Sequence, residues 1–138
     1  RAVDNLLKYC RKNLSGPGFL INLPIDVSPL AKRVETKPFD TAQGKIAQRF
    51  QVILAGSEMG NGYSELNDPI DQEERFKEQQ KLREQGDQEA QMFDHDFVEA
   101  LEHGMPPACG FGVSERLLSF LMDKPARETQ IFPLMRPK

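Results

Sequence analysis

The sequence predicts an α+β fold, in which an antiparallel β-sheet is flanked by helices that pack mainly on one side. A β-branched and apolar run at residues 50–54 meets a turn signal at residues 55–56, and a second extended segment starts at Ser57. This order is typical of a β-hairpin. Helix-start signals then open residues 68–85 and 114–121. Strands joined by a short turn and followed by helices are the pattern of an α+β domain.

Composition limits the classes of function. The chain has 138 residues and a net charge of −3 with acids and bases interspersed, so it is one domain in length and lacks a basic nucleic-acid footprint. Cys10 and Cys109 form no disulfide framework, and no signal peptide or membrane-length apolar run is present. We therefore expect a cytoplasmic protein without membrane contact. Because the sequence opens with Arg1 rather than Met, we expect an excised piece of a longer protein.

The residues before the hairpin alternate between regular and irregular segments. Residues 19–23 predict a short buried strand, and residues 27–32 an extended or looped segment. Residues 37–47 predict a mobile connection into the hairpin. At the start of the chain, residues 2–14 predict an amphipathic helix with an apolar stripe made of Val3, Leu6, Leu7 and Cys10.

Polar side chains on the hairpin form the first candidate site. If Leu54 pairs with Ser57 across the turn, Gln51 and Glu58 project from one face on neighbouring strands. Two side-chain oxygens on one face of neighbouring strands are a plausible binding site for a cation.

Three further polar residues follow with a period of two. Asn61, Tyr63 and Glu65 share a face, but their parity is opposite to that of the carboxylate before them. A bulge at Gly60 or Gly62 would bring all of them to one pocket. An ordinary hairpin with polar residues facing water explains the periodicity equally well.

Two helices are predicted after the hairpin. Asp68 and Pro69 are a strong helix start, and the charges of the helix they begin are expected to form a solvated face. A second helix is predicted at residues 94–103, with three buried residues and with His95 and His103 outside any functional spacing. The three residues expected to be buried are Phe97, Val98 and Leu101.

A glycine-containing strand and a helix form the second candidate site. Gly110 and Gly112 permit the close approach of a ligand or another backbone. Ser114 can cap the next helix, and Arg116 then lies in its first turn, where free N–H groups favour a phosphate. Core packing accounts for the same pattern.

The string Glu-Met-Gly-Asn-Gly-Tyr-Ser-Glu-Leu-Asn-Asp-Pro at residues 58–69 closely resembles the late active-site segment of class II lysyl-tRNA synthetases. A resemblance of this length is far more specific than a short motif. It extends to further segments along the chain, at residues 27–31, 71–76, 86–90, 100–107, 110–118 and 132–137.

This resemblance implies ATP, lysine and tRNA(Lys) as substrates, Mg²⁺ as cofactor and a homodimer in the complete enzyme. Asn61, Tyr63 and Glu65 would surround the lysine substrate. Glu65 would pair with its ammonium group, and Tyr63 would cover its methylene stem. Such a carboxylate rejects uncharged amino acids because it would be left unpaired.

The resemblance also implies an ATP site, with two departures from the family pattern. Glu58 and Arg116 would be catalytic, and they would bind ATP together with Gly112. The glycine segment is one residue shorter than usual. Of the two carboxylates that hold magnesium in the family, one maps onto Glu58, and the other onto Gln51, which brings no charge.

Two upstream motifs and an anticodon-binding barrel of the family have no counterpart in this sequence. We therefore expect residues 1–138 to be the carboxy-terminal part of a catalytic domain, inactive in isolation. Two alternatives stay open. One is a non-catalytic paralogue, which the glutamine and the shortened segment favour. The other is a related ligase that attaches a lysine-like amino acid to a protein.

Overall fold

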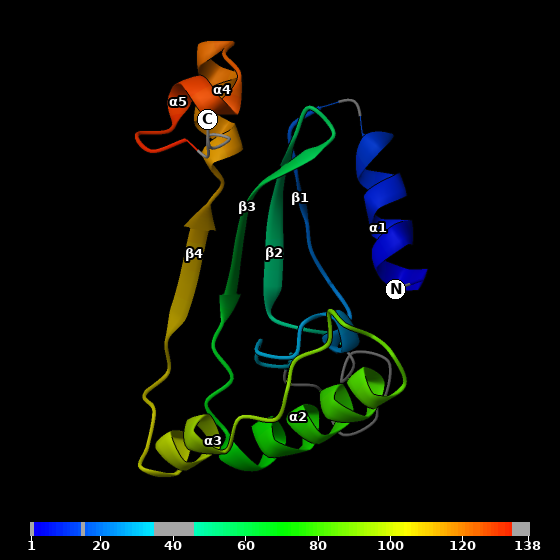
Figure 1. Cartoon of the computed structure of the whole chain (residues 1–138), viewed down its shortest axis with the longest axis vertical. Helices are drawn as coiled ribbons and strands as arrows, with labels where there is room; N and C mark the ends of the chain where they lie inside the picture. The colour runs from blue at the N-terminus through cyan, green and yellow to red at the C-terminus, as the bar shows by residue number, and fades with distance from the viewer. Residues whose placement is uncertain (1, 15, 35–45, 134–138) are drawn as a thin grey trace, which may run out of the picture. The chain divides into compact units, whose positions relative to one another are not determined.

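The computed structural model describes residues 2–14, 16–34 and 46–133 (Figure 1). Four strands form one sheet in the order β1-β2-β3-β4, and helices precede and follow them in the chain. This arrangement confirms the predicted α+β class. The elements are α1 (Ala2–Lys12), β1 (Gly18–Leu20), the 3₁₀ helix η1 (Ile25–Val27), β2 (Arg49–Leu54), β3 (Ser57–Ser64), α2 (Pro69–Glu84), α3 (His95–Glu102), β4 (Cys109–Val113), α4 (Glu115–Met122) and α5 (Ala126–Thr129).

The chain divides into two compact units. The first comprises residues 1–20, 51–62 and 111–138, and the second comprises residues 21–50 and 63–110. In the described part of the chain, no helix combines the length and the apolar character needed to cross a membrane. Most of the predicted connection at residues 37–47 lies outside the described residues.

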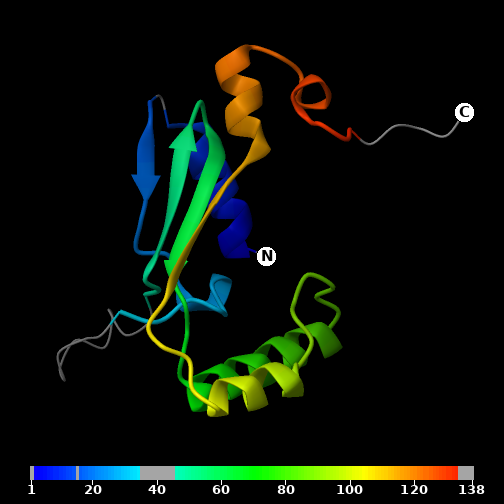
Figure 2. The same cartoon turned by 90° about the vertical axis from the view of Figure 1, so that its left-hand side faces the viewer.

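The β2–β3 hairpin is the centre of the first unit (Figure 2). Ala55 and Gly56 form its two-residue turn, with φ angles of 49° and 69°. Two central residues with positive φ define a type I′ turn, whose twist matches that of the flanking strands. The turn therefore pairs Leu54 with Ser57, as predicted.

One prediction for the first apolar run was wrong. Residues 19–23 do not form a buried strand, because the strand is limited to Gly18–Leu20 and lies at the edge of the sheet. Phe19 is 70% exposed, and Ile21 is also exposed. Asn22, with a φ of 59°, then turns the chain out of the extended conformation. Leu23 is buried, but beyond the strand.

The second unit contains α2 and α3, which lie side by side (Figures 1 and 2). Asp68 caps α2 by accepting hydrogen bonds from the backbone N–H groups of Ile70 and Asp71, and Asp94 caps α3 by accepting one from the backbone N–H group of Phe97. Both predicted helix starts are therefore confirmed. The Phe76 ring of α2 packs against Phe93 and Phe97 with centroid separations of 5.9 Å.

Two expectations about burial in these helices need correction. Phe97 is 41% exposed, although Val98 and Leu101 are buried as expected. In addition, Arg75 is buried and so does not belong to the predicted solvated face of charges on α2. The local sequence does not indicate this, since the carbonyl groups that Arg75 contacts come from another part of the chain.

Candidate active site

The predicted pair on the hairpin is present in the first unit. Gln51 Nε2 donates a hydrogen bond to Glu58 Oε2 at 2.8 Å, so both side chains project from the same face of neighbouring strands. Gln51 is buried, and the side chain of Glu58 is 31% exposed. A third residue, which the sequence did not indicate, joins them: Arg11 of α1 donates to the same Glu58 oxygen at 2.5 Å.

The two ends of the hairpin are held by different contacts. The turn pairs Leu54 with Ser57, and the Ser64 N–H donates to the carbonyl of Gln48, a residue that precedes β2, at 3.0 Å. The bulge at Gly60 or Gly62, which would bring Asn61 to the same pocket as Glu58, stays a prediction.

Glu65 is held in the second unit by backbone contacts on both sides. Its N–H donates to the Ala108 carbonyl at 2.9 Å, and the residue forms an antiparallel bridge with Ala31. The side chain is half-buried and forms no ion pair with any residue of the described ranges. A Cβ added at Gly110 would lie 3.1 Å from Glu65 Oε1, so this glycine provides the room that the carboxylate occupies.

Tyr63 lies beside a small cavity of about 180 Å³ in the same unit. Arg49 and the loop at residues 28–31 share its wall. Burial raises the pKa of the Tyr63 hydroxyl above its ordinary value, the charge of Glu65 adds to the rise, and the charge of Arg49 opposes it. The hydroxyl is therefore neutral at pH 7 and can donate or accept a hydrogen bond.

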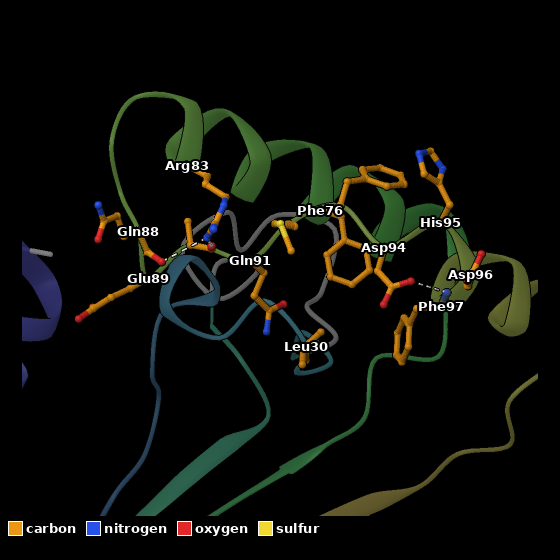
Figure 3. Close-up of a pocket in the computed structure, with 13 residues that line it drawn as sticks. Leu30, Phe76, Arg83, Gln88, Glu89, Gln91, Asp94, His95, Asp96 and Phe97 are labelled. Atoms are coloured by element: carbon orange, nitrogen blue, oxygen red, sulfur yellow. Dashed lines mark hydrogen bonds between the residues drawn. The ribbon is translucent and has the colours of Figure 1, made fainter.

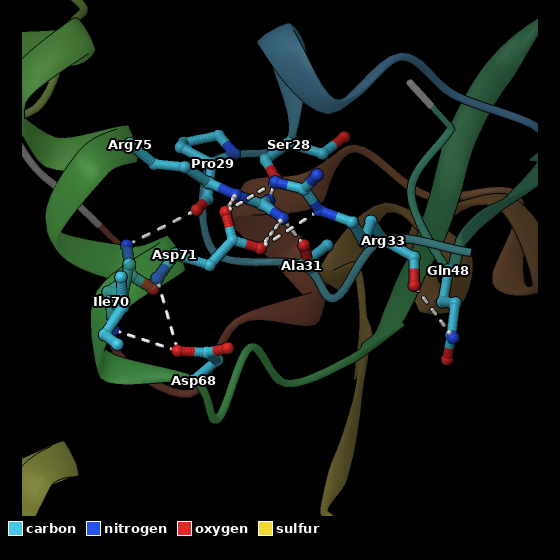
Figure 4. A network of polar contacts seen from close by, with 10 residues as sticks. Ser28, Pro29, Ala31, Arg33, Gln48, Asp68, Ile70, Asp71 and Arg75 are labelled. Carbon is cyan, nitrogen blue, oxygen red and sulfur yellow. Dashed lines mark hydrogen bonds and ion pairs between the residues drawn. The ribbon is translucent and has the colours of Figure 1, made fainter. Parts of the chain in front are cut away.

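An ion-pair cluster around the buried Arg75 fixes the loop that lines this cavity (Figure 4). Arg75 Nη1 donates to the carbonyls of Ala31 at 2.6 Å and of Ser28 at 3.4 Å. The same guanidinium makes two hydrogen bonds to the Asp71 carboxylate, at 3.0 and 2.9 Å. Arg33 completes the cluster with two further hydrogen bonds to Asp71. One α2 residue therefore connects the helix to the wall of the cavity.

The predicted phosphate-binding segment lies in the first unit. Ser114 Oγ accepts a hydrogen bond from the Arg116 N–H at 3.3 Å, which confirms the predicted cap at the start of α4. The Arg116 side chain is exposed and has no ion-pair partner within residues 2–14, 16–34 and 46–133. A Cβ added at Gly60 would lie 3.2 Å from the Gly112 carbonyl, so β3 and β4 approach closely beside the glycine to which the resemblance assigns a role in ATP binding.

A larger cavity of about 760 Å³ lies elsewhere in the second unit (Figure 3). Phe76, Phe97 and the segment at residues 88–96 line much of it. None of the residues predicted to bind lysine, ATP or metal lines this cavity. We therefore do not assign the chemistry to it, despite its size.

Sequence reasoning missed the roles of Arg11, Arg49 and Arg75, and it did not identify the group that approaches Gly110. Each arginine acts on residues far away in the sequence, so no local pattern could indicate its partner. The glycine was noted as a point of close approach, and the structure now identifies Glu65 as the group that approaches it.

If Glu65 binds lysine, as the resemblance implies, Gly110→Ala should raise the lysine KM by about tenfold, because a small displacement of a binding group has effects of this order. The added methyl group would press on Glu65 Oε1 and shift the carboxylate. The measurement is lysine-dependent ATP–pyrophosphate exchange by the complete protein. Gly18→Ala is the matched control, since no atom lies within 4 Å of its added Cβ. An unchanged lysine KM would contradict the proposed position of Glu65.

The antiparallel sheet, the strand pair that carries polar side chains and the capped helix after β4 define a portion of a class II aminoacyl-tRNA synthetase fold. In agreement with this, the chain matches the family described as tRNA synthetases class II (D, K and N) over residues 5–136, and it belongs to that family.

Its relatives are similar along the whole chain. It is 46% identical to a lysine–tRNA ligase of Thermotoga maritima over 99% of its length, and 50% identical to one of Thermosipho africanus over 98%. A lysine–tRNA ligase of Porphyromonas gingivalis is 45% identical over 100% of the chain. The chain spans about a quarter of the length of these curated relatives, with 26%, 26% and 23% of each covered.

Proposed function

We propose that this chain is part of the catalytic domain of a lysine–tRNA ligase. The observation that carries the proposal is the half-buried carboxylate of Glu65, which has no ion-pair partner in the described ranges and lies near Tyr63. An unpaired carboxylate in such a place suits the ammonium group of lysine, and an aromatic ring suits its methylene stem. Asn61, on the same strand, is proposed as a third contact to the amino acid.

ATP would bind through the residues near the start of α4. Arg116 has an exposed guanidinium without a partner in the described ranges, in the first turn of a capped helix. A cation there opposes the helix dipole, and an anionic ligand such as a phosphate group explains its position. Gly112 is proposed as a further ATP contact, and the absence of a side chain at Gly60 leaves room for the Gly112 carbonyl, which would lie 3.2 Å from an added Cβ.

The proposed reaction has two steps. A carboxylate oxygen of lysine attacks the α-phosphorus of ATP, the bond to pyrophosphate breaks, and lysyl-adenylate forms. A hydroxyl group at the 3′ end of tRNA(Lys) then attacks the lysyl carbonyl carbon, and AMP leaves. Arg116 and Glu58 act by positioning and by charge, since phosphoryl transfer needs little covalent chemistry from the protein.

Magnesium enters this proposal as the companion of the ATP phosphates. We further propose that the complete protein is a cytoplasmic homodimer in which residues 1–138 form the carboxy-terminal part of the catalytic domain. The two cysteines are free and exposed, which suits a reducing compartment.

The decisive experiment measures ATP–pyrophosphate exchange by the complete protein with each amino acid in turn, and then charging of tRNA(Lys). Exchange that requires lysine, followed by charging, supports the proposal. Exchange with a lysine-like amino acid and transfer to a protein would favour the related ligase. The absence of exchange with any amino acid would favour the non-catalytic paralogue.

Arg116→Ala should lower the rate of adenylate formation by about a hundredfold, which is the usual loss when one preorganised charge at a reacting group is removed. The melting temperature should stay within a degree or two of the unaltered protein, because the side chain is exposed. Arg127→Ala, at an exposed arginine of α5, is the control and should change neither quantity. A large loss of stability with unaltered ATP affinity would show that Arg116 is structural.

A further inference from the structure

The Gln51–Glu58 pair already contains a cation. Arg11 Nη1 lies 2.5 Å from Glu58 Oε2 and 3.5 Å from Gln51 Oε1, so the guanidinium lies between the two oxygens to which the resemblance assigns a metal ion. The Arg11 side chain is only 11% exposed. This contact joins residues that are 47 positions apart in the sequence, and all three residues belong to the first compact unit.

The donor set does not fit a divalent ion in this arrangement. Divalent magnesium prefers several oxygen ligands in a near-octahedral shell and is bound mainly by carboxylates and phosphates. Here Glu58 Oε2 accepts from both Arg11 and the Gln51 amide, and Gln51 Oε1 accepts from Arg11. In the described ranges, no group of three or more histidine, cysteine, aspartate or glutamate side chains could hold a metal ion.

Charge balance leads to the same conclusion. Two carboxylates would carry two negative charges and would match a divalent ion. With glutamine at position 51, one negative charge remains on Glu58, and the single positive charge of Arg11 neutralises it. A divalent ion placed beside this guanidinium would meet repulsion in a partly buried place, where screening by water is weak.

Arg11 is also prepared for this role by its own helix. It lies in the last turn of α1, where the helix dipole favours a cation, and its Nε donates to the Leu7 carbonyl at 3.3 Å. The end of the same helix meets the hairpin turn: a Cβ added at Gly56 would lie 3.4 Å from the Arg11 carbonyl. Arg11 is therefore held in place at its side chain, by the Leu7 carbonyl, and at its backbone, by the hairpin turn.

We propose that Arg11 is the resident cation of the Gln51–Glu58 pair, and that the pair consequently does not bind a divalent metal ion. Arg11 is a positioning residue in this scheme: it holds Glu58 in place and supplies the positive charge that a metal ion would otherwise bring. The inference deepens the proposed function, on which the placement of this pair beside the ATP phosphates rests. Its test needs neither ATP nor activity.

The test is Mn²⁺ binding to the complete, nucleotide-free protein, measured by electron paramagnetic resonance of the free ion. The Glu58→Gln variant and the unaltered protein should bind Mn²⁺ with affinities that differ by less than twofold. The double variant Arg11→Met/Gln51→Glu should gain one site with at least tenfold higher affinity, and adding Glu58→Gln should abolish that site. Gln51→Glu alone should gain less than threefold, because Arg11 can also pair with the new carboxylate.

Lys12→Met is the matched control, since it removes an exposed cation from the next position of α1. A Mn²⁺ site in the unaltered protein that disappears in Glu58→Gln would overturn the inference. So would a double variant that folds, by its circular dichroism and melting curve, but gains no site. If the Arg11→Met chain fails to fold, the comparison of Glu58→Gln with the unaltered protein still decides. Failure of lysine-dependent exchange would refute the proposed function but would leave this result unaffected.

Discussion

Glu65→Gln in the complete protein is expected to raise the lysine KM by about a hundredfold, while the KM for ATP changes by less than threefold. The glutamine side chain keeps the size of glutamate but loses its charge, so the lysine ammonium group loses a charge-assisted hydrogen bond. Removing one partner of a desolvated charge pair costs on the order of 3 kcal/mol, which corresponds to about two powers of ten in affinity.

The measurement is ATP–pyrophosphate exchange at varied lysine and varied ATP. Glu99→Gln, which removes an exposed carboxylate from α3, is the control and should have no effect on either KM. Glu65→Asp separates charge from reach, because it keeps the charge and shortens the side chain. Equal lysine affinity in Glu65→Gln would show that this carboxylate does not bind the substrate.

Arg75→Leu is expected to lower the free energy of unfolding by about 3 kcal/mol or more, the usual cost of breaking a buried ion pair. Arg75 is 9% exposed, and its loss would leave the Ala31 carbonyl without its 2.6 Å hydrogen bond. The Asp71 carboxylate would keep Arg33 as its other partner. Thermal or urea unfolding measures the effect, and Lys81→Met, at an exposed site of α2, should change stability by less than 0.5 kcal/mol or so.

The pH dependence of stability gives a second test of the same cluster. Burial alone would raise the pKa of Asp71, but the hydrogen bonds and charges of Arg75 and Arg33 outweigh it and hold that pKa below its ordinary value. A carboxyl group with a lowered pKa stabilises the fold at pH values above its unfolded pKa, and this stability is lost as the pH falls through the folded pKa. Asp71→Asn should therefore flatten the fall in stability in acid. If the stability of Asp71→Asn falls as steeply in acid as that of the unaltered protein, another carboxylate is responsible for the pH dependence.

Local signals predicted the elements whose formation depends on neighbouring residues. Asp68 and Ser114 cap the helices that they were expected to cap, and the pair at residues 55–56 makes the expected turn. Each of these features is decided within a few residues, because a cap or a turn satisfies nearby backbone groups. The order of the strands in the sheet also agrees with a hairpin at its centre.

Burial and long-range ion pairs could not be predicted from local sequence patterns. Arg11 and Arg75 are charged helix residues of the kind that usually faces solvent. Both side chains are nevertheless mostly buried, and they contact groups more than forty positions away in the sequence. Phe19 is an apolar residue of the kind that usually lies in a core, but it lies at a sheet edge, where its side chain is exposed. In each case the deciding contact comes from the fold and not from the periodicity of the local segment.

The alternation of side chains along β3 has a consequence for sequence evolution. Substitutions along this strand change one side chain at a time, whereas the loss or gain of a single residue between Ser57 and Ser64 would exchange the faces of every side chain beyond it. Such a change would place Asn61 and Tyr63 on the opposite face of the strand in one event. The strand can therefore vary in composition but has to keep its length, so conserved spacing from the turn to Glu65 should mark the members of this family that retain amino-acid activation.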